Sequence, residues 1–146
     1  KVYKQQCIPA ADYGAGVWGY GNANSLQLEE NRFCRRALNL PPTTSTYICH
    51  QELGLQYIED RIKIAPVLLW MAVWNNAETI LTKEVLSDCL SLEKGHKIKW
   101  LSYVRHMLQR IGKIECYLHP EDLEQGVKQV VKDLLLGALA EERACI

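Results

Sequence analysis

The sequence predicts an all-α protein: a single compact domain over residues 1–146, with six to eight helices around a buried central helix at about 58–76. Three observations lead to this prediction. The 146 residues suffice for one ordinary domain with a sizeable core. Apolar residues recur at helical spacing along most of the chain, whereas no stretch alternates apolar and polar residues as a half-buried strand does. The stretch 64–74 is apolar on every side, which is typical of a helix at the centre of a domain.

The N-terminal part is predicted to be helical but interrupted. Over residues 1–18 we expect a bend or break near Pro9, because proline removes a backbone donor. Four glycines then loosen the backbone, at Gly14, Gly16, Gly19 and Gly21. Asn24 or Ser25 is suited to cap the next helix. That helix stops at Leu40-Pro41-Pro42, because the residue before a proline is disfavoured in the helical region.

The helix that follows the glycines is predicted to be amphipathic. Its apolar side holds Leu26, Glu30, Phe33 and Ala37, and its charged side, at spacings that allow an ion pair, holds Glu29, Arg32 and Arg36. A short helix is expected over residues 47–53, with cap residues available at Thr44, Ser45 and Thr46. Gly54 suits its end, where a left-handed residue is favoured.

The central helix carries one marked apolar face, at Ile58, Ile62, Ala65, Leu69 and Ala72. We therefore expect Leu69 to be deeply buried. Pro66 should either kink this element or divide it into two helices.

Three further helices are predicted in the C-terminal half. The first spans about 82–92 and ends before Lys94-Gly95. The second ends at Gly112 and has its apolar stripe at Ile98, Leu101, Val104, Leu108 and Ile111. The last begins at His119-Pro120-Glu121-Asp122, because proline and acids favour a helix start. Its predicted stripe is Leu123, Val127, Val130, Leu134 and Ala138.

Composition and charge exclude several classes of protein. The chain is 48% hydrophobic and 23% charged, as in a globular protein and not a disordered one. Lys plus Arg and Asp plus Glu both number 17, so the basic excess of a dedicated nucleic-acid-binding protein is missing. The longest apolar run is much shorter than the ~20 residues of a membrane span. Since the chain begins at Lys1 and not at Met, we expect a signal peptide, a pro-segment or the rest of a larger protein before it.

The cysteines are the main indication of cellular compartment. Their even number permits disulfides, so all six are disulfide candidates: Cys7, Cys34, Cys49, Cys89, Cys116 and Cys145. Buried free thiols are the alternative, because cysteine is among the most buried residue types.

Neither a catalytic site nor a metal site is predicted. The glycines lack the spacing of a phosphate-binding loop, and we interpret the acids Asp12, Glu52 and Glu59-Asp60 as solvated or capping groups. Cys49-His50 and Cys116-x-x-His119 have the residue types of metal ligands, but no second half with matching spacing follows them. We therefore predict a non-enzymatic protein with no cofactor and no metal.

Residues 94–113 give the strongest functional signal, since they contain six Lys and Arg residues and no acid. The candidate nucleic-acid-binding residues are Lys97, Lys99, Arg105, Arg110 and Lys113, and Trp100 and Tyr103 lie nearby for stacking on bases. The competing interpretation is a solvated face that balances the acids of the last helix. The zero net charge favours this second interpretation.

Three sequence blocks follow one another between residues 13 and 54: Tyr13-Gly14-Ala15-Gly16-Val17-Trp18, Phe33-Cys34-Arg35-Arg36-Ala37-Leu38-Asn39-Leu40-Pro41 and Glu52-Leu53-Gly54. Over roughly residues 1–110 the chain resembles the region that follows the polymerase core in reverse transcriptases of LINE-type (non-LTR) retrotransposons. In that family a Glu usually stands where Gly16 stands here. The resemblance implies a helical region, with the metal-binding carboxylates of the polymerase upstream of it.

Two functions are open. The first, which we favour, is a non-enzymatic structural or binding protein derived from such a reverse-transcriptase tail. Processing and cysteine content would place it outside the cell, and self-association is among its candidate interactions. The second is the C-terminal region of an actual LINE-type reverse transcriptase, nuclear or cytoplasmic, which contacts nucleic acid through residues 94–113. Disulfides would distinguish them, because disulfides are rare in the cytosol and nucleus.

Overall fold

The structure is a computed structural model of the chain, and it describes residues 2–19, 21, 23–75, 80–93, 99–119 and 126–145. Every regular element in these ranges is helical, so the predicted all-α class is confirmed. In chain order the elements are η1 (Tyr3–Cys7, π-helical), α1 (Ile8–Asp12), α2 (Ala15–Trp18), α3 (Asn24–Ala37), α4 (Thr46–Leu53), α5 (Ile58–Asn75), α6 (Ile80–Glu93), α7 (Lys99–Arg110), α8 (Glu115–Leu118) and α9 (Val127–Ala144). These exceed the six to eight helices predicted, because α1, α2 and α8 are short turns that the apolar pattern does not resolve.

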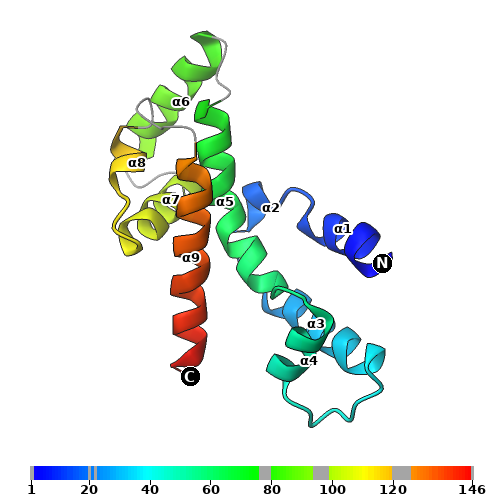
Figure 1. Cartoon of the computed structure of the whole chain (residues 1–146). Helices are drawn as coiled ribbons and strands as arrows, with labels where there is room; N and C mark the ends of the chain where they lie inside the picture. The colour runs from blue at the N-terminus through cyan, green and yellow to red at the C-terminus, as the bar shows by residue number, and fades with distance from the viewer. Residues whose placement is uncertain are drawn as a thin grey trace.

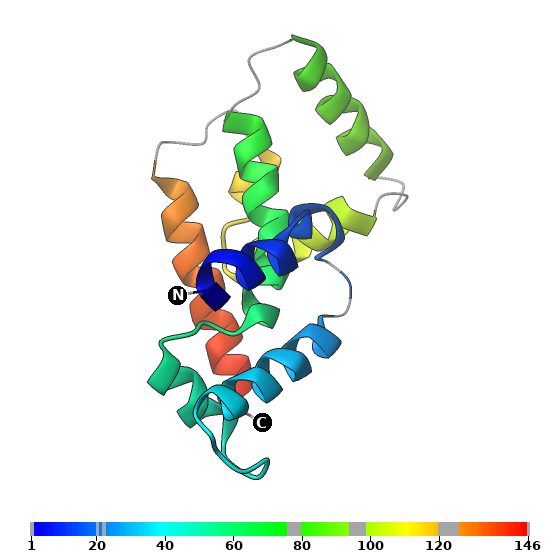
Figure 2. The same ribbon diagram turned by 90° about the vertical axis from the view of Figure 1, so that its right-hand side faces the viewer.

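Helix α5 is the centre of the fold, as the sequence predicts (Figure 1). It contacts α1, α2, α3, α7 and α9, and α9 runs alongside it in the opposite direction in both ribbon views (Figures 1 and 2). Pro66 is buried inside α5 without dividing it, so the alternative of two separate helices is wrong. None of the helices in the described ranges is both long enough and apolar enough to cross a bilayer.

The largest core cluster is built around an aromatic group on α5. The Trp70 side chain is fully buried and stacks on Tyr117 of α8, with 5.2 Å between ring centroids. Trp74 and Trp100 meet the Trp70 ring edge-on, at 5.5 and 6.2 Å. Edge-to-face pairs at such distances stabilise a core beyond the area they bury. The all-round apolar stretch of the sequence therefore forms the core, as predicted.

The N-terminal segment is interrupted at two places. The helix type changes from π to α at Cys7–Ile8, next to Pro9, which lies in the first turn of α1 where a missing backbone donor costs little. The chain then breaks at Gly14, whose φ of +68° suits glycine. The expected irregularity near Pro9 is therefore a change of helix type, and the break comes five residues later.

Helix α2 lies very close to α5, and Gly16 makes this approach feasible. A Cβ atom at Gly16 would lie 2.9 Å from the Cβ of Leu69. A Glu side chain at this position would therefore require a shift of Leu69 or of α2. Leu69 itself is only partly buried, contrary to our expectation, and the deepest side chains beyond Pro66 are Val67, Trp70 and Met71.

The predicted stripe of the last helix is wrong by one residue. The buried side chains of α9 are Val131, Leu135 and Leu139, whereas Val130 and Leu134 are 51% and 41% exposed. Both sets have helical spacing, so periodicity alone does not choose between them. The expected start of this helix at Pro120-Glu121-Asp122, and Leu123 of the stripe, lie outside the described residues. Within the described part, α9 begins after Gly126.

Several helix ends agree with the sequence, including the N-cap of α4 at Ser45, whereas α3 ends at Ala37, before the predicted stop at Leu40-Pro41-Pro42. Gly54 follows α4 with a φ of +57°, as predicted. Gly112 likewise follows α7, where the buried residues include Leu101, Val104 and Leu108 of the predicted stripe. The N-cap of α3, however, is Ala23, so neither Asn24 nor Ser25 occupies that position.

Candidate functional site

The disulfide prediction is wrong, because all six cysteines are free thiols. Cys7 and Cys145 are exposed on opposite ends of the sequence, and Cys89 and Cys116 are partly buried. Cys34 and Cys49 are both fully buried in one small apolar cluster. Burial, followed by the nearby Glu30 carboxylate, raises the pKa of the Cys34 thiol to about 11. The cysteines therefore follow the alternative of core or surface thiols.

The predicted basic face is only partly assembled in the structure. Lys99 and Arg110 are exposed and lie eleven residues apart on α7, about three helical turns, so they share one side. Lys113 is exposed just beyond the helix, whereas Arg105 is partly buried and lies on another side. Lys97 lies outside the described residues. Among the four predicted residues that the structure describes, Arg105 therefore lies apart from the side that Lys99 and Arg110 share.

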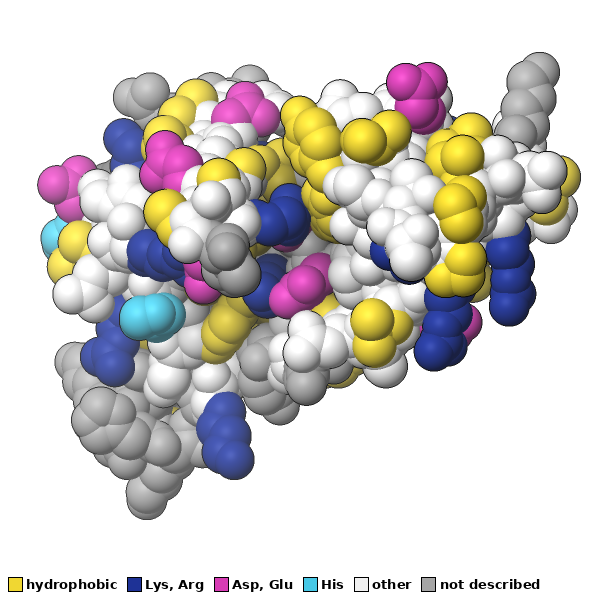
Figure 3. Space-filling view, turned by 90° about the horizontal axis from the view of Figure 1, so that it is seen from below, with side chains coloured by type: hydrophobic (Ala, Val, Ile, Leu, Met, Phe, Trp, Pro, Cys, Tyr) yellow, Lys and Arg dark blue, Asp and Glu magenta, His cyan; other side chains and the backbone are white. Residues whose placement is uncertain are grey.

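Acids further weaken this basic face. Arg110 Nη2 lies 2.9 Å from Glu142 Oε2 on α9, and this hydrogen bond and charge lower the pKa of the Glu142 carboxyl group. On the underside of the molecule, several Asp and Glu side chains lie among the Lys and Arg side chains (Figure 3). A basic helix paired with acids in this way attracts a polyanion less strongly than its own charge suggests.

The aromatic residues proposed for base stacking are engaged inside the protein. Trp100 packs against Trp70 in the core. The Tyr103 hydroxyl donates a hydrogen bond of 2.8 Å to the backbone carbonyl of Lys63, and burial raises the pKa of Tyr103 to about 12. Neither ring lies open on the surface of α7, so stacking on a nucleic acid is not supported by this geometry.

The acids considered for catalysis are tied to neighbouring cations. Asp12 Oδ2 lies 3.2 Å from Arg61 Nε, Glu59 forms an ion pair with Lys63, and Asp60 with Arg143. Glu52 is exposed on α4, as expected for a solvated acid. Within the described ranges, no group of three His, Cys, Asp or Glu residues is arranged to hold a metal ion.

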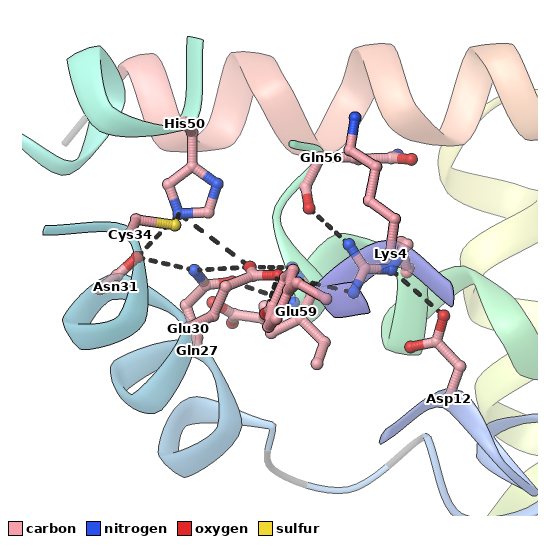
Figure 4. Close-up of polar contacts among 12 residues, drawn as sticks. Lys4, Asp12, Gln27, Glu30, Asn31, Cys34, His50, Gln56 and Glu59 are labelled. Atoms are coloured by element: carbon pink, nitrogen blue, oxygen red, sulfur yellow. Dashed lines mark hydrogen bonds and ion pairs between the residues drawn. The ribbon is translucent and has the colours of Figure 1, made fainter. Parts of the chain in front are cut away.

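A buried polar cluster, which the sequence analysis did not identify, joins η1, α3, α4 and α5 (Figure 4). Its centre is Glu30, whose side chain is 1% exposed. Glu30 accepts hydrogen bonds from the Tyr3 hydroxyl (3.0 Å), the Gln27 amide (3.4 Å) and the Ile58 backbone N–H (2.8 Å). Arg61 Nη2 lies 3.6 Å from the same carboxylate. The carboxylate is therefore surrounded by donors and a cation.

This cluster caps the N-terminus of α5 from another helix. Ile58 and Glu59 begin α5, and their free backbone N–H groups donate to Glu30 and to Gln27 Oε1, the latter at 3.0 Å. The negative charge of Glu30 also interacts favourably with the positive end of the α5 helix dipole. The sequence does contain one indication of this cluster, since Glu30 lies on the apolar side of its helix. An acid among apolar residues needs a buried partner.

His50 lies at the edge of the cluster, on α4. Its Nε2 atom is 3.0 Å from Asn31 Oδ1, 3.9 Å from Cys34 Sγ and 4.0 Å from Glu30. The imidazole stacks on the Tyr57 ring at 4.1 Å between centroids, and the Arg143 guanidinium covers the Tyr57 ring at 3.8 Å. Burial lowers the pKa of His50, against the opposing effect of the Glu30 carboxylate. Burial thus favours the neutral form of the ring.

A cavity of about 520 Å³ opens beside His50, between α4, the start of α5 and the C-terminal part of α9. We call it the α4–α9 pocket, and its lining includes Tyr47, His50, Leu55, Tyr57, Ala140, Arg143 and Ala144. The lining is largely apolar and aromatic. The Nδ1 atom of His50 is buried and has no hydrogen-bond partner in the protein. The lining also includes the polar side chains of Thr46, Gln51 and Gln56. The volume is in the range of small-molecule sites.

A scan against protein-family models, a search of curated proteins and a search of solved structures each found no match. The resemblance to the LINE-type region therefore depends on the sequence blocks alone.

Proposed function

We propose that this chain is a non-catalytic helical binding domain, derived from the region that follows the polymerase core of LINE-type reverse transcriptases, and that it binds a ligand in the α4–α9 pocket. One contrast carries the proposal. The buried acid Glu30 is fully engaged by protein groups, whereas the adjoining His50 lines an open cavity between α4, the start of α5 and α9. The contacts of Glu30 are explained by their contribution to stability. The cavity beside His50 is suited to bind a ligand.

The absence of catalysis is supported by the roles of the acids. A general acid or base must reach a substrate proton within hydrogen-bond distance. Glu30 is enclosed and caps α5, while Asp12 and Asp60 are held by arginines. Releasing any of them would break a structural contact, which is unfavourable for a catalytic group.

The free thiols also change the cellular setting of the proposal. Disulfides were the main reason to expect a secreted protein, and none forms among the six cysteines. Six free thiols suit a reducing compartment. The binding domain therefore does not depend on export.

The experiment is a binding test with a panel of four small aromatic probes: indole, benzofuran, benzoate and benzylamine. Protein NMR spectra would follow the backbone amides of α4 and the end of α9. In a blocked variant, Ala140→Trp, the new ring fills the pocket from an exposed position; in the control, Glu141→Trp, the same ring points elsewhere. We expect at least one probe to bind wild type and the control but not the blocked variant. No pocket-dependent binding by any of the four would refute the proposal.

A second candidate is nucleic-acid binding through α7, favoured by Lys99 and Arg110 on one side of that helix. Such binding must weaken as salt rises, with a log–log slope of about −0.7 to −0.9 per phosphate contact. Lys99→Ala with Lys113→Ala should then reduce that slope by about two units in total, whereas Lys83→Ala on α6 should not change it. Because Arg110 is held by Glu142, we expect no salt-sensitive binding in wild type.

A further inference from the structure

Helix α6 has a second apolar side that is exposed. On its inner side Leu86 is 7% exposed, and it packs with Leu90 into the largest core cluster. On its outer side Leu81, Val85 and Leu92 are 69%, 51% and 50% exposed. Both ribbon views place α6 at the edge of the molecule (Figures 1 and 2). Since one apolar stripe is enough to pack a surface helix, the outer stripe is suited to a partner.

The exposed residues form one line along the helix. Leu81, Val85 and Leu92 occupy positions i, i+4 and i+11, which is the spacing of the apolar contact line between two packed helices. The position that completes this line, i+7, is the exposed Asp88. We call these four residues the α6 seam. A helix packed on the α6 seam would cover three apolar side chains and one carboxylate.

Asp88 restricts the kind of helix that can cover the α6 seam. A carboxylate removed from water between two helices is unfavourable unless a cation pairs with it. Glu84 is also exposed and borders the α6 seam one turn before Asp88. Neither acid forms an ion pair with another of the described residues. Lys83, the only cation in the sequence of α6, lies on the far side of the helix.

A second copy of α6 does not supply the missing cation. With the two seams fully overlapped in a parallel pair, the Asp88 carboxylates would face each other. In an antiparallel pair, each Asp88 would face Val85 of the other copy. The first arrangement brings like charges together, and the second buries a carboxylate against an apolar side chain. A different helix with Lys or Arg at the facing position avoids both costs.

We infer that the α6 seam docks an amphipathic helix of another protein, with apolar residues at the same spacing and a Lys or Arg opposite Asp88. The α6 seam is separate from the α4–α9 pocket, because α6 follows the end of α5 and the pocket adjoins its start. Docking therefore does not depend on the proposed function. The contact involves one side of a 14-residue helix, so the complex is small and transient.

The test uses four labelled synthetic helices that carry leucine at three positions of the matching line and a variable residue at the fourth. The variable residue is Lys or Glu, placed at i+7 to face Asp88 in a parallel complex or at i+4 to face it in an antiparallel complex. Fluorescence polarisation measures the affinity of each peptide for the whole chain. We expect one Lys peptide to bind at least about tenfold more tightly than its Glu counterpart, as one ion pair in a contact shielded from water provides.

Two charge variants test the role of Asp88. Asp88→Lys should reverse the preference, so that the Glu peptide binds more tightly. Asp133→Lys makes the same charge change at an exposed site on α9 and should leave the preference as in wild type. Both residues are exposed, and circular dichroism checks that each variant remains helical. Equal affinity for Lys and Glu peptides in both orientations, or an unchanged preference in Asp88→Lys, would overturn the docking of a basic helix.

Two further variants test the apolar part of the α6 seam. Leu81→Ser combined with Val85→Ser should weaken the Lys peptide at least about tenfold. The matched control is Val17→Ser combined with Leu28→Ser, which removes two apolar side chains that are 66% and 57% exposed on other helices, and it should bind as wild type does. Absence of binding by all four peptides would overturn the proposal. So would a dimer of the protein alone, detected by sedimentation and lost in the Leu81/Val85 variant, because the occupant would then be a second copy.

Discussion

Replacing Glu30 by alanine should be among the most destabilising single changes in this protein. The substitution leaves the buried Ile58 N–H and the partly buried Tyr3 hydroxyl without the carboxylate that accepts their hydrogen bonds at 2.8 and 3.0 Å in the wild type. It also removes one partner from Arg61, which keeps its contact with Asp12. A buried donor that loses its acceptor reduces the free energy of unfolding by about 1–3 kcal/mol. Removal of one partner of a buried ion pair reduces it by about 3–5 kcal/mol. We therefore expect a loss of about 3–5 kcal/mol in the free energy of unfolding.

The assay is urea unfolding followed by far-ultraviolet circular dichroism, with two companions to Glu30→Ala. Glu30→Gln keeps an oxygen for the helix N-terminus but removes the charge, so it should cost less, about 1–2 kcal/mol. Glu29→Ala is the matched control one residue away. Its side chain is 65% exposed and pairs with Arg32 on the surface, so the loss should stay below about 1 kcal/mol. If Glu30→Ala matched Glu29→Ala, the capping role of the cluster would be refuted.

Three further predictions follow from the close helix contact, the thiols and the buried histidine. Gly16→Ala should destabilise the protein by about 1–3 kcal/mol, because the new Cβ would lie 2.9 Å from Leu69. Gly137→Ala on α9, where a Cβ meets no other atom, should stabilise the protein by about 0.5–1 kcal/mol. Urea unfolding measures both changes, and changes of the same sign would contradict the close approach of α2 to α5. Maleimide should label Cys7 and Cys145 rapidly in the folded protein, and Cys34 and Cys49 only after unfolding. Mass spectrometry of the labelled protein measures both. A disulfide between any two of the cysteines would contradict the structure. Because the pKa of His50 is lower in the folded state, the unfolded state binds more protons below about pH 6.5. The free energy of unfolding should therefore fall as the pH decreases through that range. His50→Phe should remove this pH dependence, whereas His106→Gln on the surface of α7 should leave it unchanged.

The central part of the fold was predictable because its sequence signal has no competing interpretation. A stretch that is apolar on all sides has to be buried, and α5 is buried. The last helix was predictable as an element but not in orientation. Its two candidate stripes, one through Val130 and one through Val131, differ by one residue, and only packing against α5 selects the second.

The candidate site was much less predictable, since it depends on side chains brought together from distant segments. Glu30 had a local signal, an acid on an apolar helix side, but its partners Tyr3 and Ile58 are 27 and 28 residues away. His50 was considered as a metal ligand with Cys49, because the sequence shows adjacency and not the direction of each side chain. The disulfide prediction failed for a similar reason. An even number of cysteines permits disulfides, but burial in the core explains the presence of Cys34 and Cys49 without a disulfide.

The most direct test is a set of crystal structures of the wild-type protein, each grown with one of the four aromatic probes. We predict at least one probe in the α4–α9 pocket, with its ring against Leu55 and Ala140. An empty pocket at saturating concentrations of all four probes would contradict the account.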